Sequence, residues 1–233
     1  MPLTIKGLQK TTLVDYPDKV ACTIFLPKCN FRCGFCYNRD LVIDYDSLPT
    51  LSEEDILNFL KEKRKWLDGV VFTGGEPTLH KELPDFIKKI KEMNYLIKID
   101  TNGTNPKMLK ELIDNKLVDY VAMDIKAPLD KYDQITNVNI NKEKVQESIS
   151  LLRNSSVDSE LRLTCVPTLH SNEDIKKIGE WLKGNKKLFL QQFQPDKKMI
   201  DLKLLNVKPF SKETLEEFKE ILKNYIKDVQ IRS

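Results

Sequence analysis

The chain alternates between short apolar runs and longer stretches in which apolar residues recur at every third or fourth position. The short runs are rich in β-branched side chains, which is typical of buried strands. The longer stretches have the periodicity of helices that pack one face on a core. The predicted strands cover residues 20–26, 70–72, 95–100, 120–124, 160–166 and 188–193, and residues 229–231 could add a short edge strand. The predicted helices begin near residues 52, 83, 105, 142, 171 and 211.

Helix-capping residues support several of these starts. Ser52 is followed three residues later by Asp55, and Asn105 precedes Pro106, so each pair fits the beginning of a helix. Strands that each precede a helix form a parallel sheet, because parallel neighbours need a crossover connection. The sequence therefore predicts an α/β fold with helices outside a mostly parallel sheet, in a single domain over residues 1–233. Such a sheet could close into a barrel or part of one, or stay open and doubly wound.

Polar clusters follow the predicted strands at the points where the strands end. A cysteine-rich loop follows the first strand, and the later clusters are residues 74–77 (G-G-E-P), 100–103 (D-T-N-G), 124–126 (D-I-K) and 192–194. In parallel sheets the carboxyl ends of the strands meet at one edge, where functional groups gather. We therefore expect one functional site at that edge.

Composition and charge narrow the class of protein. The chain is 40% hydrophobic, and its 38 basic and 35 acidic residues give a net charge of +3. This near balance gives no reason to expect nucleic acid as a partner. No apolar run approaches the roughly 20 residues of a membrane-spanning helix, and the first residues do not resemble a signal peptide. Because the cysteine usage fits a reducing compartment, we expect a soluble, cytoplasmic protein with no membrane partner.

Three cysteines within eight residues, Cys29, Cys33 and Cys36, have the spacing C-x3-C-x2-C. Three thiolates this close can hold three irons of a cubane iron–sulfur cluster, which normally takes four cysteines, and leave the fourth iron open to a small molecule. A structural zinc site would need a fourth ligand, but the other cysteines and both histidines are isolated. A disulfide with one spare thiol suits small secreted scaffolds better than a chain of 233 residues. We expect this loop to lie outside the hydrophobic core.

These motifs resemble those of the radical S-adenosylmethionine (SAM) superfamily. The pattern C-x3-C-x-aromatic-C, with Phe35 as the aromatic residue, follows the first predicted strand, and G-G-E-P follows the second. Residues 13–21 (L-V-D-Y-P-D-K-V-A), D-T-N-G and M-D-I-K are similar to those of the activating enzymes of glycyl-radical proteins. Within that group the resemblance is closest to the activating proteins of anaerobic ribonucleoside-triphosphate reductases.

The resemblance implies a partial (β/α)6 barrel with one [4Fe–4S] cluster held by Cys29, Cys33 and Cys36. SAM would bind the fourth iron, and reductive cleavage of its C5′–S bond would yield methionine and a 5′-deoxyadenosyl radical. In activating enzymes this radical removes a hydrogen atom from a glycine of the partner, which would be an anaerobic ribonucleotide reductase or a similar glycyl-radical enzyme. Since the sequence has no second cysteine cluster, the electron would come from an outside donor such as flavodoxin or ferredoxin.

The resemblance also implies roles for residues close to the cysteines. Gly74 and Gly75 lack a β-carbon and would approach the amino group of SAM. Glu76 would add a carboxylate beside that ammonium, or else cap the helix that follows. Phe35 and Tyr37 would border the adenine, or else only pack within the loop.

Further site residues are expected on the later strands: Asp100, Asn102, Asp124, Lys126, Arg162 and Gln194. Asp124 and Lys126 would serve the SAM site, whereas Asp100 could instead hold a cation together with Asp124. The structural alternatives are an Asp–Lys pair and a plain turn at D-T-N-G. Arg162 could pair with a carboxylate or face solvent. Gln194 would make one weak hydrogen bond near the ribose.

Two other functions stay open at this point. A radical SAM enzyme similar to 7-carboxy-7-deazaguanine synthase would act on a small molecule and would need a closed pocket with groups that bind it. A single-cluster electron carrier would bind no SAM, and its G-G-E-P and M-D-I-K motifs would then have no purpose.

Overall fold

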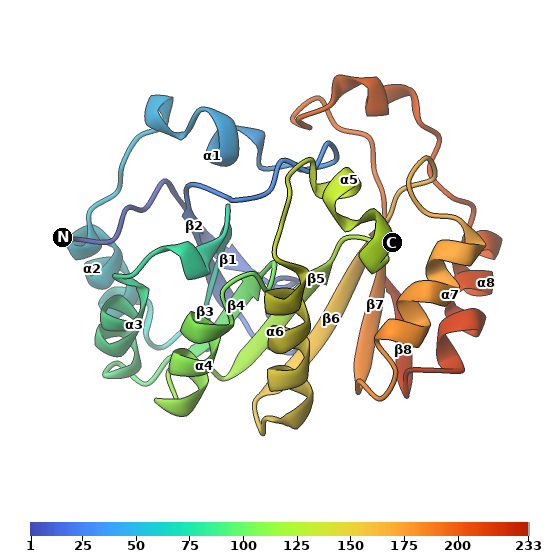
Figure 1. The fold of residues 1–233 in the computed structure, drawn as a ribbon. Helices are drawn as coiled ribbons and strands as arrows, with labels where there is room; N and C mark the ends of the chain where they lie inside the picture. Colours follow the sequence, from blue (N-terminus) through green and yellow to red (C-terminus); the bar gives the residue numbers. More distant parts are fainter. Residues whose placement is uncertain (233) are drawn as a thin grey trace.

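The computed structural model describes residues 1–232 and is built on one eight-stranded sheet (Figure 1). The strands lie side by side in the order in which they occur in the sequence. The first two strands pair antiparallel, and every later neighbouring pair is parallel. The strands are β1 (Gly7–Thr12), β2 (Ala21–Leu26), β3 (Gly69–Gly74), β4 (Leu96–Thr101), β5 (Tyr120–Ile125), β6 (Asp158–Cys165), β7 (Lys187–Gln192) and β8 (Asp228–Arg232).

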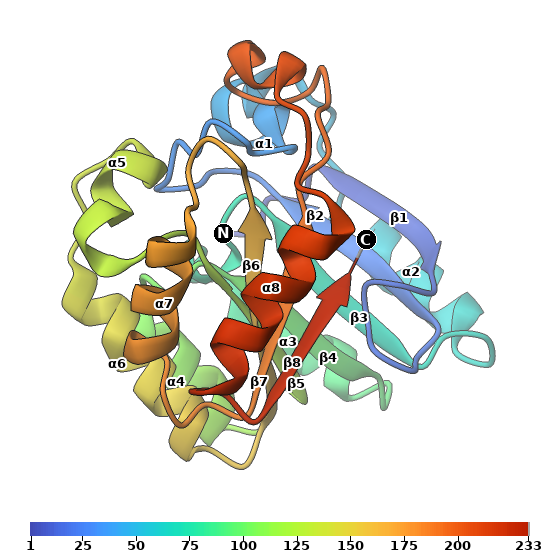
Figure 2. The same cartoon turned by 90° about the vertical axis from the view of Figure 1, so that its right-hand side faces the viewer.

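Helices in the connections between the parallel strands cover one face of the sheet (Figure 1). They are α2 (Glu53–Lys63), α3 (Leu83–Lys91), α4 (Pro106–Asp114), α6 (Lys142–Asn154), α7 (Asn172–Trp181) and α8 (Lys212–Lys223). Shorter helical pieces lie in the connections: α1 (Arg39–Ile43), η1 (Tyr45–Ser47), η2 (Pro77–Leu79), η3 (Leu129–Lys131), α5 (Tyr132–Thr136) and η4 (Leu202–Asn206). Figure 2 shows α1, α5 and the segment with η4 above the C-terminal ends of the strands. Within residues 1–232, no helix has the length and apolar character needed to cross a membrane.

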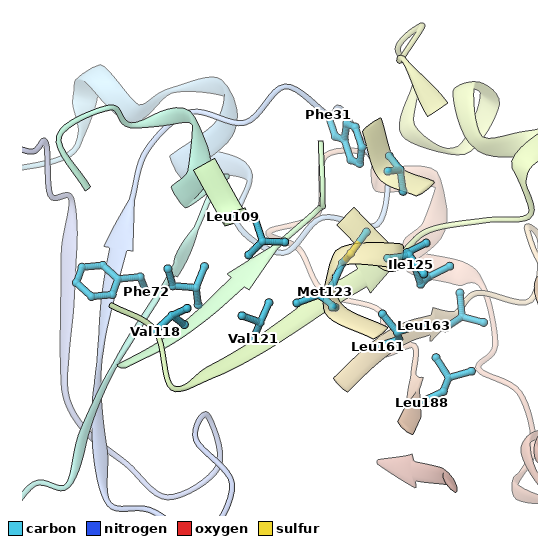
Figure 3. Close-up of a cluster of buried hydrophobic side chains, with 14 of the residues drawn as sticks. Phe31, Phe72, Leu109, Val118, Val121, Met123, Ile125, Leu161, Leu163 and Leu188 are labelled. Atoms are coloured by element: carbon cyan, nitrogen blue, oxygen red, sulfur yellow. The ribbon is translucent and has the colours of Figure 1, made fainter. Parts of the chain in front are cut away.

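Alternation along the strands separates an apolar face from a polar one. On β5, Val121, Met123 and Ile125 are fully buried, and Figure 3 shows them in one apolar cluster with Leu163 of β6. Successive side chains of a strand point to opposite faces. Asp124, between two of these apolar residues, therefore lies on the other face of the sheet, away from the helices.

Helix starts follow the capping signals in the sequence. The side chain of Ser52 accepts a hydrogen bond from the backbone N–H of Asp55 at the start of α2. Asn105 caps α4 through Met108, and Ser171 forms a capping box at the start of α7. These predictions are confirmed, because a cap involves only residues that are close in the sequence.

The sheet is not closed: within residues 1–232, β1 and β8 are its edges and do not pair with each other. Strands β2 to β7 and the helices that follow them form the partial (β/α)6 barrel implied by the sequence resemblance. The expected edge strand is β8, which is parallel to β7. The sequence did not predict β1, because most of its side chains are exposed or only partly buried.

Candidate active site

A cavity of about 280 Å³ lies at the C-terminal ends of the parallel strands. This volume is just below the usual range for small-molecule pockets, roughly 300–1,000 Å³. Thirteen of the fourteen residues predicted for the site line the cavity: Cys29, Cys33, Phe35, Cys36, Tyr37, Gly74, Gly75, Glu76, Asp100, Asn102, Asp124, Lys126 and Arg162. The exception is Gln194, which is exposed and lies outside this lining.

The cysteine loop packs more tightly than expected. Phe31, Cys33 and Phe35 are at most 5% exposed and belong to the hydrophobic core, so the expectation of a loop outside the core is wrong. The ring of Phe31 makes an edge-to-face contact with Tyr132 of α5 and lies in the apolar cluster of Figure 3. Burial of alternate residues therefore holds the loop in place.

All three loop cysteines are free thiols. Burial raises the pKa of Cys29 to about 12 and that of Cys33 to about 11, so the neutral thiols are favoured until a cation stabilises the thiolates. Within residues 1–232, no three His, Cys, Asp or Glu side chains converge on a point where one metal ion could bind. A zinc site requires such convergence, whereas the cysteines of a cubane cluster each bind a different iron.

The G-G-E-P turn packs directly against the cysteine loop. A β-carbon on Gly75 would lie 1.9 Å from the carbonyl oxygen of Lys28, so only glycine fits. The backbone N–H groups of Gly75 and Glu76 donate to the carbonyl oxygens of Leu26 and Lys28, at 2.8 and 2.7 Å. Gly74 has a φ of +115°, which also favours glycine. The two glycines therefore allow this turn to pack closely against the cysteine loop.

Glu76 is almost completely buried, with 1% of its surface exposed. Its carboxylate accepts hydrogen bonds from the N–H of Thr78, the hydroxyl of Thr101 and the N–H of Asn102, at 3.1, 2.8 and 2.6 Å. Burial raises the pKa of Glu76, although these hydrogen bonds oppose the shift. The side chain therefore caps η2, as the structural alternative expected, and joins the ends of β3 and β4 beside the cavity.

Charged side chains from neighbouring strands meet in the cavity wall. The Nε of Arg162 lies 2.8 Å from an oxygen of Asp124, and its Nη1 lies 3.3 Å from an oxygen of Asp100. The Nζ of Lys126 is 3.0 Å from the other oxygen of Asp124, and the buried Lys98 pairs with Asp100. Arg162 therefore bridges two carboxylates and does not face solvent.

These cations lower the pKa of both carboxyls. Burial alone would raise the pKa of Asp124, but Arg162 and Lys126 outweigh it and hold the pKa far below its usual value. Arg162 and Lys98 likewise lower the pKa of Asp100 against the effect of burial. With all five groups ionised, this ion-pair network holds three cations and two carboxylates, which leaves one excess positive charge within the network; the carboxyl of Glu76, elsewhere in the lining, is not part of it. An anionic ligand group is therefore favoured at this point over the cation considered from the sequence.

Phe35 and Tyr37 flank Cys36 but differ in their surroundings. Phe35 is buried, and the Nζ of Lys126 lies 5.8 Å from the centre of its ring. Tyr37 is 38% exposed, and its hydroxyl accepts a hydrogen bond from the backbone N–H of Gln194 at 3.0 Å. Gln194 therefore does not line the cavity itself, but its backbone N–H is hydrogen-bonded to Tyr37, which does.

Comparison with known proteins identifies the family. The family model of the Radical SAM superfamily matches residues 23–182, which is more than half of the chain. The chain belongs to the radical SAM superfamily. It is 36% identical over 241 residues to a Methanocaldococcus jannaschii protein provisionally named a glycyl-radical enzyme activating enzyme, and the match covers 100% of this chain and 97% of the relative. It is also 28% identical over 239 residues to the pyruvate formate-lyase 1-activating enzyme of Escherichia coli K12, with 95% of each chain covered.

A solved structure has a similar fold. Streptococcus suis SuiB bound to S-adenosylmethionine superposes with a TM-score of 0.68 and 13% identity, over 91% of this chain and 52% of that chain. The present chain thus spans about half of that protein, and the likeness concerns the fold alone. The protein is a radical SAM enzyme related to glycyl-radical enzyme activating enzymes, and membership of the family implies SAM and a [4Fe–4S] cluster as cofactors.

The cavity of this radical SAM enzyme fits those cofactors. Three free thiols offer the soft ligands that iron–sulfur clusters take, and the excess positive charge beside Lys126 and Arg162 suits a carboxylate. Gln192, which lines the cavity, donates its side-chain N–H to the carbonyl of Phe210. Its Oε1 is buried and has no hydrogen-bond partner among residues 1–232, so this acceptor is available to a donor of the ligand.

Other residues of the radical SAM barrel were missed from the sequence. Lys98 pairs with Asp100, and Glu160 of β6 accepts two hydrogen bonds from Arg232 of β8, at 2.7 and 2.8 Å. The available signal was the recurrence of charge at alternate positions, as in Lys98–Asp100 and Glu160–Arg162. Residues two apart in a strand share a face, so charged pairs of this kind indicate a polar interior.

Proposed function

We propose that this radical SAM enzyme activates a glycyl-radical enzyme, and in particular an anaerobic ribonucleotide reductase. The observation that carries the proposal is that Cys29, Cys33 and Cys36 line one cavity at the C-terminal edge of an unclosed sheet. Full-length similarity to a protein provisionally named an activating enzyme supports a protein partner. The choice of the reductase rests on the motifs L-V-D-Y-P-D-K-V-A and M-D-I-K.

Cys29, Cys33 and Cys36 would hold one [4Fe–4S] cluster. Cys22 and Cys165 are fully buried in β2 and β6 and do not line the cavity, which supports a single cluster. When bound, this cluster would supply the electron for reductive cleavage of SAM, and the radical chemistry that follows would be directed at a glycine of the partner.

The protein's own side chains would bind and orient SAM. Lys126 and Arg162 would attract its carboxylate through the excess positive charge of their network. Gly74 and Gly75 would leave room for backbone contact with its amino group, and the buried carboxylate of Glu76 would favour that positive charge nearby.

The remaining predicted residues would contact other parts of SAM or orient the residues that bind it. Phe35 and Tyr37 would border the adenine, and Gln194 would position Tyr37 through its backbone N–H. Asp100 and Asp124 would orient Arg162 between them and would not hold a metal cation.

The unclosed sheet supports a protein substrate over a small one. Within residues 1–232, β1 and β8 do not pair, so strand pairing does not close the barrel on that side against a peptide segment. Since a single cluster is proposed, an outside donor such as flavodoxin or ferredoxin would supply the electron. We further propose that residues 1–233 act as a single radical SAM domain in the cytoplasm, with no membrane or nucleic-acid partner.

Anaerobic reconstitution with iron and sulfide, followed by dithionite and SAM, tests the first half of the proposal. The wild-type protein and Cys165→Ala should form 5′-deoxyadenosine, whereas Cys33→Ala should not, because Cys33 lines the cavity and Cys165 does not. If wild type forms none, the assignment of cluster and SAM is wrong.

Co-incubation with an anaerobic ribonucleotide reductase tests the second half. Electron paramagnetic resonance should show a glycine-centred radical in the reductase, at the expense of SAM. Formation of 5′-deoxyadenosine without that radical would contradict this partner, and the small-molecule alternative would then be favoured.

A further inference from the structure

Three polar side chains form a closed ring of hydrogen bonds between the cysteine loop and the loop that follows β4. Asn102 donates from Nδ2 to the Oδ1 of Asn30 at 2.8 Å. Asn30 donates from its own Nδ2 to the hydroxyl of Thr104 at 2.9 Å, and that hydroxyl donates to the Oδ1 of Asn102 at 2.6 Å. The ring joins segments that are 72 residues apart in the sequence.

The ring and its neighbours fix the orientation of the Asn102 amide. The backbone N–H of Thr104 donates to the Oδ1 of Asn102 at 3.0 Å, so the oxygen must point toward Thr104. The backbone N–H of Asn102 is held by Glu76 at 2.6 Å, and Asn102 is only 5% exposed. Its NH2 group is therefore directed at the cysteine loop.

The second hydrogen of that NH2 group is directed at a cysteine. The Nδ2 of Asn102 lies 3.8 Å from the Sγ of Cys29, which also accepts from the backbone N–H of Phe31 at 3.4 Å. Among residues 1–232, no other side chain donates to the sulfur of Cys29, Cys33 or Cys36. Cys29 is thus distinguished from the other two cysteines by a side-chain donor.

We propose that Asn102 is a positioning residue for Cys29, and that its N–H···S hydrogen bond raises the reduction potential of the cluster. The inference rests on the proposed function, since it takes Cys29 as a cluster ligand. Reduction adds negative charge, part of which lies on the ligand sulfurs, and a donor to such a sulfur stabilises the reduced form more than the oxidised one. The sequence resemblance implies that Asn102 belongs to the SAM site. Its hydrogen bonds in the structure connect it to Asn30 and Cys29 of the cysteine loop.

Three variants separate the hydrogen bond to sulfur from the ring itself. Asn102→Ala removes the donor, and Asn102→Asp keeps the shape and the acceptor for Thr104 but replaces the donor with a carboxylate oxygen. Thr104→Val is the matched control, because it breaks the ring at the hydroxyl but leaves both the backbone N–H of Thr104 and the NH2 group of Asn102 in place. Asn102→Asp also serves where Asn102→Ala fails to fold or to retain the cluster.

The readout is the midpoint potential of the reconstituted cluster without SAM, followed by electron paramagnetic resonance during a redox titration. We expect a more negative potential for Asn102→Ala, a still more negative one for Asn102→Asp, and the wild-type potential for Thr104→Val. Wild-type potentials in both Asn102 variants would overturn the inference, and so would an equal shift in Thr104→Val. A wild-type protein that takes up no [4Fe–4S] cluster would overturn both this inference and the proposed function. The expected shifts without any glycyl radical would overturn the proposed function alone.

Discussion

The hydroxyl of Tyr37 and the backbone N–H of Gln194 form a hydrogen bond between residues 157 positions apart. It connects the cysteine loop with the segment after β7. A second bond, from the N–H of Asp201 to the carbonyl of Gly34 at 2.8 Å, joins the same two segments. The segment that follows β7 is therefore attached to the loop that carries the three cysteines.

Tyr37→Phe should loosen the first of these two connections. A net hydrogen bond is worth about 1 kcal/mol, so hydrogen exchange at the Gln194 amide should become about fivefold faster. The amide of Asp201, whose bond to Gly34 is intact in this variant, is the internal control. Unchanged exchange at Gln194 would show that the hydroxyl does not protect it.

Arg162→Met should destabilise the fold. It leaves Asp100 and Asp124 without their shared cation, and removing one partner of a buried ion pair costs about 3 kcal/mol. Lys110→Ala breaks the exposed pair with Asp114 and should cost less than about 1 kcal/mol. Urea denaturation at neutral pH measures both free energies of unfolding, and equal losses would contradict a buried role for Arg162.

Gly75→Ala should displace the cysteine loop, because its β-carbon would lie 1.9 Å from the carbonyl oxygen of Lys28. We expect a loss of about 2 kcal/mol in the free energy of unfolding and a lower content of iron and sulfide after reconstitution. Gly7→Ala is the control, since its β-carbon would make an ordinary contact at 3.4 Å with Phe25. Full cluster content in Gly75→Ala would show that the turn does not hold the loop.

The fold should lose stability in acid through Asp100 and Asp124. Their pKa values are lowered in the folded protein, so their contribution is fully present above the unfolded pKa of about 3.9 and is lost as the pH falls toward the folded values. Asp124→Asn should be less stable at neutral pH and should lose less stability between pH 5 and pH 2. Urea denaturation at a series of pH values gives both curves. Curves of equal slope would exclude Asp124 as a source of the acid sensitivity.

Local sequence patterns determined the order of the elements and most of the site. The strand that contains Asp124 and the helix capped by Ser52 were predictable, because periodicity and capping depend on residues that are close in the chain. Once the sheet is parallel, the ends of its strands must meet. Residues as far apart as Cys29 and Arg162 could therefore be assigned to one cavity.

Only the tertiary structure decided which partner each polar side chain meets. Lys98 lies in a strand that reads as apolar, and its pairing with Asp100 depends on which face of the sheet is polar. The donation from Asn102 to the sulfur of Cys29 depends on how one loop packs on another 73 residues away. Contacts of this kind follow from strand register, sheet curvature and loop packing. These are properties of the whole fold that no local periodicity specifies.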